Sequence, residues 1–83
     1  MITNYHLLAR LHAVTRVALA HFQKPTEWRL AQSLVHDLVG DKELTHLLGH
    51  PVDVIPFDNR SFLMCDGGFK YVVVEHIDAR FGV

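Results

Sequence analysis

The segment Arg60–Asp78 constrains the fold of this chain more than any other. Two apolar runs in it flank Asp66-Gly67-Gly68. Glycine readily adopts the positive φ angles that a tight hairpin turn requires. We therefore predict a β-hairpin over this segment.

The turn also predicts which side chains share a face of the hairpin. With a two-residue loop, at either Gly67-Gly68 or Asp66-Gly67, every side chain keeps the same face. One face is then mainly aromatic, and we expect the helices to cover it: Phe62, Met64, Phe69, Tyr71 and Val73. The other face is more apolar than a strand surface facing water usually is, so another element, a partner or a second copy of the chain should cover it. It holds Leu63, Cys65, Val72 and Val74.

The chain before the hairpin is predicted to be mostly helical. Asn4–Phe22 shows apolar residues at helical spacing, and Asn4 is a suitable N-cap. Thr26–Val39 follows Pro25 and has apolar residues around roughly half of a helical circumference. A helix with so wide an apolar face is expected to lie between two other elements.

A shorter helix and a strand are predicted between these helices and the hairpin. Lys42–Leu48 follows a capping aspartate and ends at Gly49, which predicts a third helix. Val52–Ile55 is predicted to be a strand, and the prolines on both sides of it favour a sheet edge. The predicted fold class is therefore α+β, with two N-terminal helices and a short third helix on a three-stranded antiparallel sheet that includes the C-terminal hairpin.

Length and composition indicate one globular domain over residues 1–83, because 49% of the residues are hydrophobic and the chain is too short for two cores. The single cysteine cannot form an intramolecular disulfide, which favours a reducing compartment. No apolar run approaches the ~20 residues of a transmembrane helix, and we identify no secretory signal. We expect a cytoplasmic protein.

The net charge of −1 hides an uneven distribution. Residues 1–26 contain three basic residues and no acidic one, whereas the remainder contains five basic and nine acidic residues. The split could let one half of the chain complement the other, or it could mark a helix that faces anionic groups. The polar flanks of the predicted first helix hold Tyr5, Arg10, His12 and Arg16, which are residue types that serve well as interface anchors.

The chain contains seven histidines, which raises the question of metal binding or catalysis. His46 and His50 have the helical spacing of a two-histidine zinc site, but Gly49 and Pro51 break the helix there. Cys65 is the only thiol, and His76 lies about five residue pairs from it in the hairpin, out of hydrogen-bonding range. We therefore predict no catalytic residue, no metal ligand and no cofactor, and a protein that is not an enzyme.

The leading functional hypothesis is a small regulator or inhibitor that occupies the surface of a partner protein, as phage- and plasmid-encoded factors do to host or defence machinery. Its predicted partner-binding residues are Tyr5, Arg10, His12, Arg16, Leu63, Val72 and Val74. The alternative is a nucleic-acid-binding regulator that uses the basic first helix, or a helix-turn-helix made by the second and third helices. A third hypothesis, a metal- or thiol-dependent enzyme, would require bound zinc or an activated Cys65 thiolate.

Overall fold

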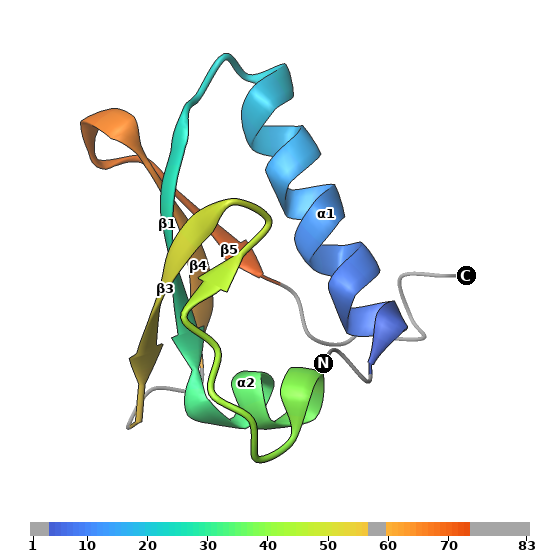
Figure 1. The fold of residues 1–83 in the computed structure, drawn as a ribbon. Helices are drawn as coiled ribbons and strands as arrows, with labels where there is room; N and C mark the ends of the chain where they lie inside the picture. Colours follow the sequence, from blue (N-terminus) through green and yellow to red (C-terminus); the bar gives the residue numbers. More distant parts are fainter. Residues whose placement is uncertain (1–3, 57–59, 74–83) are drawn as a thin grey trace.

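Two helices pack on one face of a five-stranded mixed sheet in the computed structural model, which describes residues 4–56 and 60–73 (Figure 1). The strand order is β2-β3-β1-β4-β5, and β1 runs parallel to β3 and antiparallel to β4. The elements are α1 (Tyr5–Ala20), β1 (Pro25–Ala31), α2 (Gln32–Val39), β2 (His46–Leu47), β3 (His50–Ile55), β4 (Ser61–Cys65), the 3₁₀ turn η1 (Asp66–Gly68) and β5 (Lys70–Val73).

The first helix and its N-cap are confirmed. The Asn4 side-chain oxygen accepts a hydrogen bond from the Leu7 backbone N–H at 3.1 Å. This bond satisfies one of the backbone donors that have no partner within the helix. The buried residues of α1, Leu7, Leu11 and Ala18, belong to the predicted apolar stripe. Leu19 and Phe22, which the same stripe placed in the core, are exposed, and the helix ends at Ala20 rather than at Phe22.

The end of α1 has an unusual residue in a standard motif. The Gln23 N–H donates to the Ala18 carbonyl at 2.9 Å, and the Phe22 N–H donates to the Leu19 carbonyl at 3.0 Å. This pair of bonds is the Schellman motif, which places one residue in the left-handed region, usually a glycine. Here that residue is Phe22, with φ of 59° and a side chain that is 94% exposed.

The prediction of one helix over Thr26–Val39 was wrong. Its first part forms β1, and only the remainder forms α2. In β1 the buried residues Trp28 and Leu30 alternate with the partly exposed Glu27 and the exposed Arg29. This alternation is the two-residue period of a strand, but over so few residues it also matches a helical stripe.

The predicted helix over Lys42–Leu48 was also wrong. The segment forms a loop and β2, and a tight turn follows in which Leu48 (φ 50°) and Gly49 (φ 84°) both have positive φ. Two such residues in succession are typical of a two-residue β-hairpin. Without this helix there is no helix-turn-helix between Thr26 and Leu48.

The strand over Val52–Ile55 is confirmed as part of β3. The predicted edge position is wrong for β3 as a whole, although β2 pairs only with His50 and Pro51 and none of the described strands pairs with the other side of Val52–Ile55. β3 lies between β2 and β1, and the sheet is neither three-stranded nor purely antiparallel. Pro51 is tolerated there because it pairs only with the two-residue strand β2, opposite His46.

The hairpin itself is confirmed, but its predicted faces were wrong. The loop contains three residues, Asp66–Gly68, and the Cys65 N–H donates to the Phe69 carbonyl at 2.7 Å. A loop with an odd number of residues shifts the pairing by one residue. Leu63 therefore lies opposite Tyr71 and on the same face as Tyr71, whereas Val72 lies on the other face. The helices therefore cover Leu63, Cys65, Tyr71 and Val73, while Phe62 and Met64 lie on the open face with Val72.

One hydrophobic core joins the helices to this face of the sheet. Its centre is Trp28, which has no exposed surface and pairs with Val52 on one side and Leu63 on the other. The indole N–H of Trp28 donates to the Leu47 carbonyl at 2.9 Å and holds β2 against the core. The Cα radius of gyration, 12.5 Å, is close to the ~12 Å expected of a compact chain of this length.

The buried hydroxyl of Ser61 supports a first testable prediction. Ser61 Oγ accepts a hydrogen bond from the Ala31 N–H at 2.8 Å, at the junction of β1 and α2, and Ser61 is 1% exposed. Ser61→Ala removes the acceptor and leaves a buried donor without it, so the free energy of unfolding should fall by about 1–3 kcal/mol in urea denaturation. Ser33→Ala, at an exposed position of α2, is the control and should change it by less than about 0.5 kcal/mol.

The left-handed Phe22 supports a second prediction. Phe22→Gly should raise the free energy of unfolding by roughly 0.5–1 kcal/mol, because glycine avoids the steric penalty at φ 59° and little packing is lost from an exposed ring. Phe22→Ala keeps the penalty and should give no such gain. Equal stability of the two variants in urea denaturation would show that Phe22 is not strained.

Candidate protein-binding surface

The predicted partner-binding residues differ in their exposure to solvent. Tyr5, His12 and Arg16 are exposed on α1, with Tyr5 71% exposed, and Arg10 is half-buried. Leu63 is fully buried and cannot contact a partner, which corrects its assignment to a second, exposed hairpin face. Val72 is 53% exposed, and Val74 lies outside the described residues.

The structure places the histidines considered as metal ligands on strands rather than on a helix. His46 and His50 lie on the paired strands β2 and β3, so their spacing is not that of a helix. Within residues 4–56 and 60–73, no group of three His, Cys, Asp or Glu side chains is close enough to hold a metal ion. His76, the other histidine considered with Cys65, lies outside those ranges.

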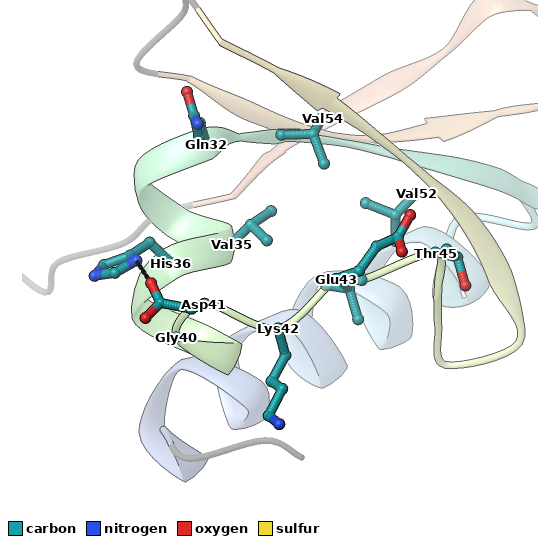
Figure 2. A pocket seen from close by; sticks show the side chains of 11 residues that line it. Gln32, Val35, His36, Gly40, Asp41, Lys42, Glu43, Thr45, Val52 and Val54 are labelled. Atoms are coloured by element: carbon teal, nitrogen blue, oxygen red, sulfur yellow. Dashed lines mark ion pairs between the residues drawn. The ribbon is translucent and has the colours of Figure 1, made fainter.

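A hollow of about 480 Å³ lies between α2, the loop that follows it and β3 (Figure 2). Val35 from α2 and Val52 and Val54 from β3 point into it, whereas Lys42 points away (Figure 2).

The rim of the hollow is polar but loosely arranged. All six polar side chains that line it are exposed: Gln32, His36, Asp41, Lys42, Glu43 and Thr45. The His36 Nδ1 lies 3.8 Å from an Asp41 carboxylate oxygen, and solvent screens this pair because both side chains are largely exposed. The hollow could receive a small apolar group, but it does not hold a buried polar group that would orient a ligand.

The more distinctive feature is a surface shared by α1 and β5, which we name the α1–β5 surface. It holds four exposed large apolar residues: Val17 (46%), Phe22 (94%), Phe69 (57%) and Val72 (53%). Large apolar residues that gather on the surface of a small protein mark sites of protein association.

Two separate depressions lie along the α1–β5 surface. A groove of about 200 Å³ lies between α1 and β5 and is lined by Ala13, Val14, Val17, Tyr71 and Val72. At the end of α1, a second depression of about 280 Å³ joins Phe22 to the hairpin tip at Asp66 and Gly67. Phe69 adjoins this tip, because a Cβ at Gly67 would lie 3.6 Å from its ring.

A ring contact fixes the two elements of the surface relative to each other. His21, the C-cap of α1, stacks on Tyr71 of β5 with ring centroids 6.0 Å apart and an interplanar angle of 11°. The Tyr71 hydroxyl also lies 3.3 Å from His21 Nδ1. Phe22, the next residue, is therefore held beside the hairpin.

The surroundings of the α1–β5 surface are mainly basic. α1 contains no acidic residue, and its Arg16 is exposed. Lys24 and Lys70 lie on the strand side of the surface, and the Lys70 ammonium lies 4.8 Å from the centre of the Phe62 ring on the open face. Asp66 is the acidic residue at the hairpin tip, where its carboxylate accepts a hydrogen bond from the Gly67 N–H at 3.0 Å.

Sequence reasoning missed Val17, Phe22 and Phe69 as surface residues. Phe22 fits the apolar stripe of α1 by spacing, so the pattern assigned it to the core. A detectable signal was its place after the last turn of a helix and before Lys24-Pro25, where a left-handed C-terminal residue is expected.

Comparisons with protein-family models, with curated proteins and with solved structures find no match. In the described part of the chain, neither helix has the length and apolar character needed to cross a membrane.

The environment of Cys65 supports a third prediction. Burial raises the pKa of the Cys65 thiol, so the thiol should stay protonated at pH 8, and its alkylation by iodoacetamide should be at least about tenfold slower in the native protein than in urea. Because the native state holds this proton more tightly, the free energy of unfolding should fall as the pH rises above the ordinary thiol range of about 8.5. Native labelling as fast as that of the unfolded chain would contradict both expectations.

Proposed function

We propose that this protein is a protein-binding module, a small regulator or inhibitor that acts by occupying the surface of a partner protein. The partner is bound through the α1–β5 surface. We also propose that it acts in the cytoplasm, since its one cysteine is a free thiol and reducing compartments preserve free thiols.

The observation that carries the proposal is the conformation and exposure of Phe22. A phenylalanine at φ 59° is strained, and a ring that is 94% exposed contributes little to folding. Folding would favour glycine at this position. An aromatic ring held outward despite the strain is the type of residue that anchors protein interfaces.

The position of Phe22 supports the same function. Phe22 and the hairpin tip line one depression, and Phe69 adjoins that tip, so a partner that covers the Phe22 ring would also meet Phe69. The basic residues around the region, Arg16 and Lys70 among them, favour a partner that is acidic at its rim.

The alternative, nucleic-acid binding through α1, retains one supporting observation. α1 is free of acidic residues, and His12 and Arg16 are exposed on it. The number of fixed cations is small for a phosphate-binding surface, and the sequence pI is about 6.6. The protein-binding proposal is therefore preferred, and the two differ in their response to nuclease.

The proposal predicts that Phe22→Gly reduces partner binding although it raises stability. The wild type, Phe22→Gly and Leu19→Ala would each be immobilised, and nuclease-treated lysate of the source organism applied and analysed by mass spectrometry. Leu19 is the control, because it is 55% exposed but about 160° around α1 from Val17 at 100° per residue. The wild type and Leu19→Ala should retain the same protein, and Phe22→Gly should retain at least about tenfold less, as expected for loss of an interface anchor.

Two outcomes would contradict this proposal. Equal retention by Phe22→Gly would exclude Phe22 as an anchor. Loss of every retained protein after nuclease treatment would instead support nucleic-acid binding by α1, and Arg16→Glu should then abolish the interaction at low salt.

A further inference from the structure

β5 is the outer strand of the described sheet. β5 pairs with β4 on one side, and none of the other described strands pairs with its opposite side. Unpaired N–H and C=O groups on a sheet edge are a template for an added strand. The edge lies next to the groove formed by Ala13, Val14 and Val17 of α1.

The register of the hairpin identifies the outward groups. The Cys65 N–H donates to the Phe69 carbonyl, so Cys65 and Phe69 form a hydrogen-bonded pair. In an antiparallel ladder such pairs alternate with pairs whose backbone groups point outward. Lys70 and Val72 occupy the alternate positions, opposite Met64 and Phe62, and therefore direct their N–H and C=O groups to the open edge.

The same register determines which side chains an added strand would meet. Tyr71 lies on the face that the helices cover, where α1 and β5 form the groove. Lys70 and Val72 lie on the open face. Because side chains alternate between faces, an added strand would place every second residue toward the groove and the others beside Lys70.

The chemistry of the two sides differs. On the groove side, Val14, Val17 and Tyr71 suit an aliphatic side chain of medium size. On the open side, Lys70 belongs to the outer strand itself, and its ammonium lies 4.8 Å from the centre of the Phe62 ring of β4. An acidic side chain of an added strand would be a cross-strand neighbour of Lys70 and could form a charge pair with it. The edge thus selects for alternating aliphatic and acidic residues.

We propose that β5 accepts an extended segment of the partner protein as a sixth strand, with aliphatic side chains toward α1 and acidic side chains toward Lys70. This inference rests on the proposed protein-binding function and specifies the form of the partner. Main-chain hydrogen bonds to Lys70 and Val72 hold the segment, and the groove and Lys70 select its sequence.

The test uses synthetic peptides and the full chain. The probe is an end-capped eight-residue peptide of alternating valine and glutamate, titrated into ¹⁵N-labelled protein. Two further peptides carry N-methyl groups, one on every valine nitrogen and the other on every glutamate nitrogen. The N–H groups of successive residues point to opposite edges of a strand, so only one of the two methylated peptides should lose binding. The unmethylated peptide and the other methylated peptide should shift the amide signals of Lys70 and Val72.

A matched pair of variants tests the same edge from the protein side. Val72→Pro removes the outward N–H of Val72 and does not interrupt the bonds between β4 and β5, because this N–H points away from β4. It should weaken peptide binding on the order of fivefold, the effect of one lost hydrogen bond. Val72→Thr keeps the backbone donor and the branched side chain, and should bind as the wild type does.

Several results would overturn strand addition. The first is an equal loss of peptide binding by the two methylated peptides, and the second is the absence of amide shifts at Lys70 and Val72. The third is a shift of these signals with protein concentration in the absence of peptide, which would indicate that a second copy of the chain binds this edge. A partner that depends on Phe22, combined with any of these results, would leave the proposed function standing and remove only the strand-addition inference. Peptide binding as expected, with a partner that is insensitive to Phe22→Gly, would remove the role of Phe22 instead.

Discussion

The position of β1 between β3 and β4 is the constraint on which the rest of the structure depends. β1 pairs in parallel with β3 on one side and antiparallel with β4 on the other, so it joins the two halves of the described sheet. Its Trp28 fills the centre of the core and binds the Leu47 carbonyl. With this strand in the middle, α2 becomes the crossover that returns the chain to the parallel strand β3, and the hairpin becomes the other half of the sheet.

Covering a five-stranded sheet with two helices leaves parts of it uncovered. α1 packs toward β5, β4 and β1, and α2 packs near β1 and β3 (Figure 1). The uncovered end of β3 becomes the hollow seen in Figure 2. At the opposite side of the sheet, the α1–β5 surface holds larger exposed apolar residues, and none of the described strands pairs with the outer side of β5.

The two sides differ in what they could contribute to binding. The hollow has a floor of small aliphatic side chains and a rim of exposed charges, which gives little orientation to a ligand. The α1–β5 surface combines aromatic rings with directed backbone groups, and the contact between His21 and Tyr71 holds its parts in place. Rigid aromatic side chains lose little conformational freedom on binding, which makes this surface the stronger candidate for recognition.

The sequence by itself determined the elements whose signals are local. The Asn4 cap with its apolar stripe specified α1, and the Asp66-Gly67-Gly68 turn between apolar runs specified the hairpin. Tertiary structure decided the rest. Residues 26–39 fit both a helix and a strand followed by a helix, and pairing with β3 and β4 selected the strand for its first part. The number of residues in the turn decided that Leu63 and Val72 lie on opposite faces of the hairpin, because one extra loop residue shifts every cross-strand pair by one position. The exposure of Phe22 depended on the Schellman turn, which directs the chain into β1 and leaves the ring outside the core that its spacing predicted.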